Sequence, residues 1–229
     1  MKHVQVMLAV MIVICCPVAD AFALPPQVDA TIFDGVAGDF DGVGDHINDT
    51  GYPQALYSQA WGFESRALME FDLSAVAGGF ESAVFTAKVD ASGEPYPFTV
   101  NVYGYSGDGA VAFGDYQAGD LLTSFGYEAQ GSVELDMTAF MNSMFDAKAS
   151  YAGLNFRIDP ELVAEDESPY LAFNSLDHPP PAALVFDYGP SAVPEPGTLV
   201  LFGTGLLGFA VRRKNNRGRS PKYNQKSCS

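Results

Sequence analysis

Three carboxylates stand close together in a glycine-rich stretch near the start of the chain. Asp39, Asp41 and Asp45 are interspersed with glycines over residues 34–49. Carboxylates on a chain that can curl suit Ca²⁺, which takes roughly six to eight oxygen ligands. The stretch is no EF-hand, because the position of its terminal glutamate is occupied by Thr50. These residues could bind calcium. The interpretation that we favour instead is a solvated acidic loop.

A second candidate site is aromatic. Trp61 is the only tryptophan of the chain, and Tyr57 and Phe63 flank it. Amphipathic rings at a wet surface can stack on the apolar faces of sugars, which makes Tyr57 and Trp61 candidate ligand-binding residues. The interpretation that we favour instead is that Trp61 packs over an edge of the folded domain.

Catalytic motifs find little support in the sequence. His46 and His178 are the only histidines beyond the N-terminal segment, and neither belongs to a recognised catalytic motif. The chain also lacks the nucleophile-elbow, phosphate-loop and H-E-x-x-H patterns. Two carboxylates could act as a pair, but in a chain with 28 acidic residues their proximity carries little information. We therefore expect no enzymatic activity and no cofactor, with Ca²⁺ as the one open question.

Three unlike features follow one another at the C-terminal end. The first is the rigid polar motif Pro194, Glu195 and Pro196, whose prolines favour extended backbone. The second is an uncharged apolar run over residues 197–211, which as a helix can just span a membrane if its flanks contribute. The third is a basic cluster made of Arg212, Arg213 and Lys214. Cations directly after an apolar span predict that this end stays in the cytoplasm.

This order of features resembles the PEP-CTERM protein-sorting signal of exported bacterial proteins, over residues 192–214. The resemblance implies that a membrane-embedded exosortase recognises the tail, cleaves near Pro194, Glu195 and Pro196, and passes the protein onward. It also implies a Gram-negative host with an exopolysaccharide-rich envelope. Members of this family usually end soon after the basic cluster, whereas this chain continues to Ser229. The competing interpretation is a permanent single-span anchor with a chance motif.

The N-terminal segment has the features of a secretory signal peptide. Lys2 supplies the positive charge and residues 6–18 supply the apolar region. The small-x-small cleavage pattern is met at residues 21–23, which would make Leu24 the first mature residue. Residues 19–21 meet the same pattern two residues earlier in the chain. The sequence therefore predicts a signal peptide over residues 1–23, with a second cleavage site open.

The exported part contains no cysteine. Cys15 and Cys16 lie inside the signal peptide, and Cys228 lies beyond the basic cluster. Disulfides, thiolate metal ligands and a cysteine nucleophile are thereby excluded from the body. The body, predicted over residues 24–189, is long enough to be stabilised by one hydrophobic core.

Charge is divided sharply along the chain. Between Leu24 and Pro196 lie 27 of the 28 acidic residues and only four of the 12 basic ones, a formal charge of −23. An acidic body of this kind repels phosphate backbones and anionic lipids. Nucleic acid is therefore excluded as a partner, and solubility outside the cell is the plain interpretation of the charge.

The body has the patterning of an all-β domain. Residues 66–72 place Ala67, Met69 and Phe71 in alternation with polar partners, and the same two-residue period recurs downstream. Further strands are predicted at residues 28–33, 82–90, 98–103, 121–125, 132–135, 152–158, 170–173 and 183–188. Residues 136–148 instead show helical spacing, with Asp136 or Thr138 as a cap. The predicted fold is a single jelly-roll β-sandwich with one short helix, between a signal peptide and a transmembrane tail at residues 190–229.

The body also resembles the DNRLRE-type domains, which are galactose-binding-like jelly rolls. The resemblance rests on the strand at residues 66–73, the helix entry at residues 135–138 and the final strand at residues 184–188. Most of these are packing residues, so the resemblance implies the fold rather than the ligand. The tryptophan-rich middle strand of that family is replaced here by residues 110–116.

Together these observations predict a non-catalytic exported protein of the cell surface or extracellular matrix. Its expected partners are exosortase and, transiently, the inner membrane; exopolysaccharide is a further candidate. The first alternative is a carbohydrate-binding module acting on exopolysaccharide, and the second is a hydrolase. The predicted route is export through the inner membrane, transient anchoring by the tail, and delivery to the surface or the medium.

Overall fold

The structure, a computed structural model, describes residues 22–35, 40–93, 97–128 and 131–188. Residues 1–21 of the predicted signal peptide and the whole sorting tail lie outside these ranges. By their internal contacts, residues 1–189 and residues 190–229 form separate units. Everything below concerns the described part of the first unit, which we call the body.

Within the described residues the body has twelve strands, one α-helix and two short 3₁₀ helices. In chain order they are β1 (Phe22–Leu24), β2 (Val28–Asp34), β3 (His46–Asn48), β4 (Gln54–Ser58), β5 (Phe63–Asp72), β6 (Phe80–Gly93), β7 (Phe98–Gly107), η1 (Phe113–Gln117), β8 (Asp120–Tyr127), β9 (Ser132–Asp136), α2 (Thr138–Asp146), β10 (Tyr151–Ile158), η2 (Pro160–Leu162), β11 (Tyr170–Phe173) and β12 (Ala183–Tyr188). The predominance of strands confirms the all-β class.

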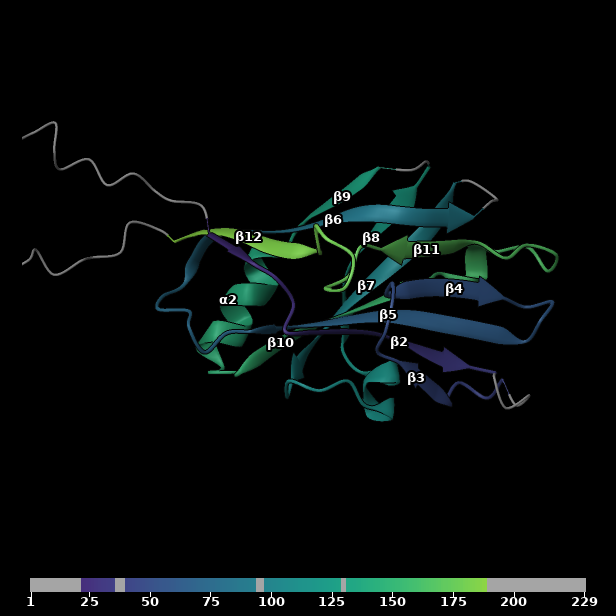
Figure 1. Cartoon of the computed structure of the whole chain (residues 1–229), viewed down its shortest axis with the longest axis horizontal. Helices are drawn as coiled ribbons and strands as arrows, with labels where there is room; N and C mark the ends of the chain where they lie inside the picture. Colours follow the sequence, from purple (N-terminus) through teal and green to yellow (C-terminus); the bar gives the residue numbers. More distant parts are fainter. Residues whose placement is uncertain (1–21, 36–39, 94–96, 129–130, 189–229) are drawn as a thin grey trace, which may run out of the picture. The chain divides into compact units, whose positions relative to one another are not determined.

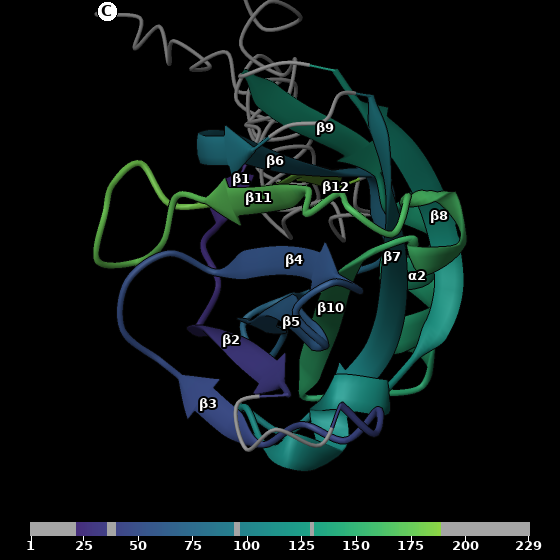
Figure 2. The same cartoon turned by 90° about the vertical axis from the view of Figure 1, so that its right-hand side faces the viewer.

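The strands pair in the order β1-β12-β6-β11-β4-β5-β10-β7-β8, and every strand pair is antiparallel. Off this path, β9 pairs with β6, β2 pairs with β5 in addition to β4 and β10, and β3 pairs with β2. Figure 2 shows that the path curves back on itself, so that β6 and β9 face β10 and β7 across the interior. This arrangement is consistent with the predicted β-sandwich.

The main core fills this interior with aromatic side chains. Phe71, Phe85, Phe156 and Phe173 are all fully buried. The rings of Phe85 and Phe156 have centroids 5.1 Å apart, and those of Phe156 and Phe173 are 4.8 Å apart. Burial of large aromatic groups dominates the energetics of such a core.

Helix α2 lies beside this core and confirms the helical prediction for residues 136–148. The N-cap residue is Met137, whose side chain makes no capping bond, so neither Asp136 nor Thr138 holds the predicted cap position. The carboxylate of Asp136 instead accepts the backbone N–H of Thr138 at 2.9 Å in the turn that precedes the helix. Phe140 and Met141 on the helix are buried. The hydroxyl of Thr138 in turn accepts the N–H of Ala83 in β6, which ties the helix to the sheet.

Three strands were not expected from the sequence. Residues 34–49 are not wholly loop, since β3 forms within them and pairs with β2. Strand β4 precedes Trp61 and pairs with β5. Strand β1 contains Phe22 and Ala23, which the sequence assigned to the signal peptide, and pairs with β12. Strands β1 and β3 are short edge elements, whereas β4 is a short strand that lies between β11 and β5. Each is fixed by the strands with which it pairs rather than by its own pattern.

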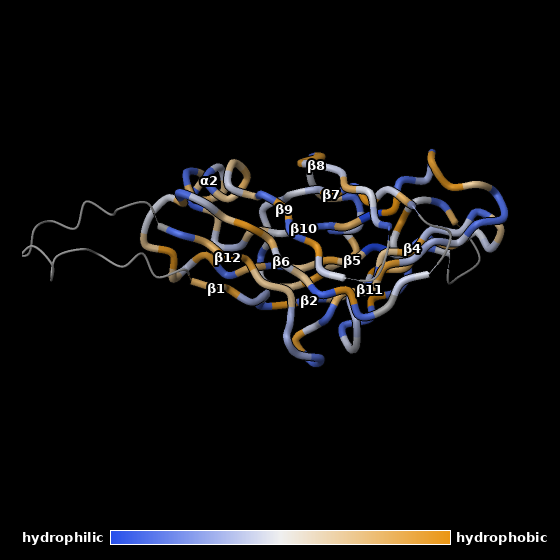
Figure 3. The backbone as a smooth tube through the Cα atoms, turned by 90° about the horizontal axis from the view of Figure 1, so that it is seen from above, coloured by the Kyte–Doolittle hydropathy of each residue, from blue (hydrophilic) through white to orange (hydrophobic). Residues whose placement is uncertain are grey.

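The two ends of the body carry different elements. Figures 1 and 3 show β1, β12 and α2 at the end where the described chain begins and finishes. The opposite end carries the turn between β4 and β5 and the loop after β10 (Figure 1). No helix among the described residues is long and apolar enough to cross a membrane, and the predicted membrane span at residues 197–211 lies outside them.

Candidate functional site

The acidic loop after β2 uses its carboxylates on its own backbone. Asp45 accepts the N–H of Gly35 at 2.8 Å, and Asp41 accepts the N–H of Val43 at 2.9 Å. Asp39, the third candidate calcium ligand, lies outside the described residues. Among the described residues no group of three or more acidic, histidine or cysteine side chains is arranged to hold a metal ion. The oxygens of Asp41 and Asp45 thus serve as caps of loop amides.

Trp61 stands on the surface rather than against the sandwich. It lies in the turn between β4 and β5, and its exposed fraction is 74%. The interpretation that it packs over a sheet edge is therefore wrong. The turn is closed by a hydrogen bond that the N–H of Gly62 donates to the carbonyl of Gln59 at 3.1 Å, and Gly62 adopts a φ of +57°.

A second loop brings another aromatic residue to the same place. Phe40, from the acidic loop, lies with its ring 6.1 Å from the ring of Tyr57. The two loops touch at Gly35, where a Cβ atom would overlap the carbonyl of Gly62. Gly35 also has a φ of +96°, so a side chain is excluded there on both counts.

We call Phe40, Tyr57 and Trp61 the aromatic tip. Phe40 and Trp61 are exposed and Tyr57 is half-buried. The tip lies at the end of the body opposite β1 and β12 (Figure 1). The sequence identified Tyr57 and Trp61 but missed Phe40, although its place between Asp39 and Asp41 was a signal, because an apolar ring in an acidic loop has no local reason to be there.

The outer face of β5 carries a buried ion-pair cluster. Arg66 and Glu64 are each 4% exposed, and their Nε and Oε1 atoms lie 2.7 Å apart. Arg157 of β10 approaches the same Glu64 oxygen at 3.3 Å from a less buried position. Two of the four cations of the body thus neutralise one carboxylate, which is the arrangement that burial of charge requires.

A covering segment closes over this face, formed by residues 107–119 and including η1. The guanidinium of Arg66 lies over the ring of Tyr116, 3.8 Å from its centroid, and donates to the carbonyl of the same residue. The side-chain amide of Asn155 donates to that carbonyl as well, at 3.1 Å. Tyr116 then packs with Ile32 and Leu68 in a small second core.

Glu70 anchors the start of the covering segment. Its side chain is fully buried, and its Oε2 atom accepts the N–H of Gly109 at 2.7 Å. Burial raises the pKa of the Glu70 carboxyl, against a smaller lowering effect of the Gly109 hydrogen bond. Burial, followed by the nearby Glu70 charge, also raises the pKa of Tyr105. Glu70 contacts the covering segment rather than an open cleft, so its evident role is to hold that segment in place.

The two histidines are not placed as general bases. Nδ1 of His178 lies 3.2 Å from the hydroxyl of Ser175, but the two are three residues apart in one turn and Ser175 is fully buried. The ring of His178 stacks on Tyr52 at 4.2 Å. His46 lies beside the ring of Phe33, with 5.9 Å between the centroids. Neither geometry presents an activated nucleophile to solvent.

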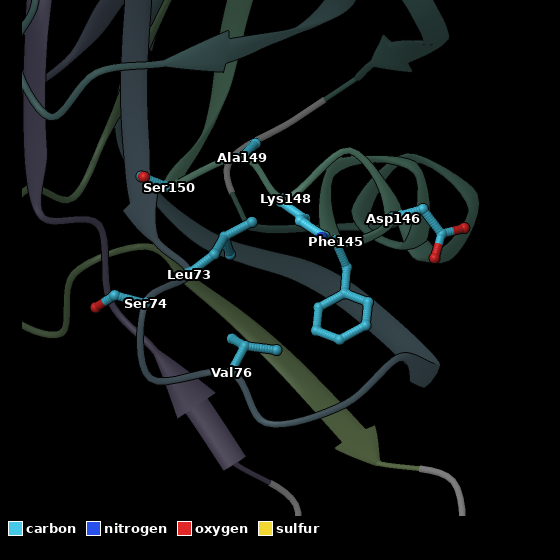
Figure 4. Close-up of a pocket in the computed structure, with 8 residues that line it drawn as sticks. All are labelled: Leu73, Ser74, Val76, Phe145, Asp146, Lys148, Ala149 and Ser150. Atoms are coloured by element: carbon cyan, nitrogen blue, oxygen red, sulfur yellow. The ribbon is translucent and has the colours of Figure 1, made fainter.

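An open hollow lies at the other end of the body, between α2 and the chain after β5. Leu73, Val76 and Phe145 face one another across it, while the carboxylate of Asp146 points away (Figure 4). Lys148, which follows the helix with a φ of +57°, stands at its rim. Apolar walls with few convergent polar groups suit packing more than specific recognition.

Comparison with known proteins assigns the C-terminal residues. A family model described as the PEP-CTERM protein-sorting motif matches residues 192–214. The match confirms the predicted sorting motif over residues 192–214. This range includes Pro194, Glu195 and Pro196 and the basic cluster Arg212, Arg213 and Lys214, all of which lie outside the described residues. Such a motif implies export, a transient C-terminal membrane anchor and processing by exosortase. A comparison with curated proteins found no match.

Proposed function

We propose that this protein is a non-catalytic component of the cell surface or extracellular matrix, delivered by exosortase-dependent sorting. The observation that carries the proposal is the sorting motif at residues 192–214 directly after an acidic β-rich body. The buried carboxylates of the body support a structural role, because Glu64 and Glu70 contact the protein's own cations and amides. A charge of −23 keeps the delivered body soluble and apart from anionic envelope components.

The sorting half of the proposal is tested by the fate of the tail. The precursor is expected in the inner membrane, with the body in the periplasm and Lys214 in the cytoplasm. Exported protein is then expected to lack everything after about Pro196. Intact-mass measurement on released material decides this, with an exosortase-deficient host as the control. Released protein that still carries Arg212 would mean that the tail is a permanent anchor.

For the fold of the body we propose the jelly-roll form of the β-sandwich and a kinship with DNRLRE-type domains. What supports this is the position of the shared strand: residues 66–72 lie in β5, which pairs with β2, β4 and β10 and so lies inside the strand order. An experimental structure whose strand connections differ from a jelly roll would overturn it.

The second candidate function is carbohydrate binding at the aromatic tip. The observation that favours it is the exposure of both Trp61 and Phe40 in two adjoining loops, with the ring of Phe40 near that of Tyr57, since exposed aromatic rings suit contacts with sugars. The acidity of the body selects a neutral glycan over a polyanionic one. The turn between β4 and β5, which carries Trp61, lies at the opposite end of the body from β12, the last described strand.

Binding of neutral and anionic polysaccharides to the exported protein tests this function. Trp61→Ala is expected to weaken binding of the neutral glycan at least about tenfold, since an anchoring tryptophan contributes about 2 kcal/mol or more. Leu121→Ala, which removes another exposed apolar side chain, from β8, is the matched control and should leave binding unchanged. Equal losses in both variants, or no glycan binding at all, would leave only the surface-protein function.

A further inference from the structure

The first strand of the body lies on the boundary of the predicted signal peptide. Strand β1 consists of Phe22, Ala23 and Leu24, and it pairs antiparallel with β12 in the register Phe22 to Phe186, Ala23 to Val185 and Leu24 to Leu184. The ring of Phe22 also lies 5.3 Å from the ring of Phe186. Residues on both sides of one cleavage site therefore belong to the same folded element.

Strand β1 protects the edge of the sheet. It is the last strand on its side of the order β1-β12-β6, so without it the backbone of β12 would be the open edge. An open edge with buried apolar residues such as Leu184 and Phe186 favours pairing with a second chain. Cleavage after Ala23 would remove two of the three residues of β1, whereas cleavage after Ala21 would remove none.

We propose that signal peptidase cleaves between Ala21 and Phe22, so that the mature protein begins with a complete β1. The proposal rests on the proposed export and adds its processing site. The sequence permits it, because Ala19 and Ala21 stand three and one residues before the cut, as the small-x-small pattern requires. The same pattern is met by Ala21 and Ala23, and the pairing of β1 with β12 is what separates the two sites.

Intact-mass measurement of exported protein decides between the two sites. The expected N-terminus is Phe22, and a mature protein that begins at Leu24 would overturn the proposal. Protein that remains inside the cell with its full N-terminal segment would instead contradict export itself. The two failures give different masses in different fractions, so they are distinguishable.

Two substitutions sharpen the assignment, because Ala21 serves both sites while Ala19 and Ala23 each serve one. Ala23→Leu blocks only cleavage after Ala23; its side chain position is exposed, so the fold tolerates it, and the Phe22 terminus should persist. Ala19→Leu blocks only cleavage after Ala21 and lies in the removed segment. It should shift the terminus to Leu24 or leave the precursor uncut. The reverse response of the two variants would overturn the proposal.

The Ala19→Leu product provides an independent measurement. Exported protein that begins at Leu24 lacks most of β1 but is otherwise the same molecule as the wild type. It should melt at a lower temperature and form more soluble oligomers, because β12 has lost its edge partner. Identical melting and oligomeric state in the two proteins would show that β1 does not contribute to the fold, and would contradict the structural basis of the proposal.

Discussion

The two faces of β5 are both buried, but by different means. On the inner face Ala67, Met69 and Phe71 join the main apolar core. On the outer face Arg66 and Glu70 are buried beneath the covering segment, where each polar group needs a partner. Apolar burial tolerates some misfit, whereas a buried charge that loses its partner is left unsolvated and unpaired. The two faces of β5 thus stabilise the fold in different ways, the inner face by apolar packing and the outer face by paired polar groups.

The largest effect is expected on the inner face. Phe156→Ala removes a fully buried ring that contacts Phe85 and Phe173, and such substitutions typically cost about 3–5 kcal/mol. Chemical denaturation of the purified body measures the loss of unfolding free energy. Phe156→Leu, which keeps most of the apolar volume, should retain the larger part of it. A loss of unfolding free energy smaller than that of an outer-face variant such as Arg66→Ala would contradict the expected order of effects.

On the outer face, Arg66→Ala should be nearly as damaging, although Arg66 belongs to no apolar core. It leaves Glu64 buried beside the more distant Arg157 and removes the contact to Tyr116, and breaking a buried pair costs about 3–5 kcal/mol. Arg157→Ala is the matched control, since its side chain is 27% exposed and its loss should be about 1 kcal/mol. Equal losses in the two variants would show that burial does not set the difference.

A smaller effect on the outer face depends on pH. Burial raises the folded-state pKa of Glu70 above its ordinary value of 4.5, so this group favours the folded state at low pH. Its contribution is lost as pH rises through the raised pKa. Glu70→Gln cannot ionise but can still accept the Gly109 amide, so it should gain stability relative to wild type as pH rises above 4.5. Denaturation midpoints from pH 4 to about pH 8 test this, and a pH-independent difference would contradict it.

The smallest effect is expected at the solvated loop. Asp41→Asn and Asp45→Asn keep an oxygen for the amides of Val43 and Gly35, so changes within about 0.5 kcal/mol are expected. Millimolar Ca²⁺ should raise the melting temperature no more than Mg²⁺ at matched ionic strength. A Ca²⁺-specific increase that the double variant loses would establish the calcium site after all.

The sequence predicted the positions of the strands better than it predicted the covering segment that packs on them. The two-residue period identified the inner residues Ala67, Met69 and Phe71 because main-core burial leaves a local pattern. The same period identified Arg66 and Glu70 only as polar partners on the other side of the strand. What buries Arg66 is Tyr116, 50 residues further along the chain. Such a contact depends on where a loop returns, and no local pattern encodes that.

The candidate sites divide in the same way. The sorting motif could be found because its chemistry is contiguous in residues 192–214. The aromatic tip could be found only in part, since Phe40 reaches Tyr57 from a separate loop, which is held against the turn of Trp61 at Gly35 and Gly62. Trp61 was misjudged because a lone tryptophan is usually explained by packing, and only the turn geometry places it in solvent.

The pairing of β1 with β12 joins the first and the last strand of the body, and β12 lies between β1 and β6. A chain that crosses a membrane from its N-terminus delivers β12 last, so β6 must wait with an open edge until nearly the whole body has been translocated. The final pairing is also the contact of longest sequence separation, which makes it slow to form. Retention of the tail in the membrane at that moment would hold each chain apart from its neighbours while the sheet closes.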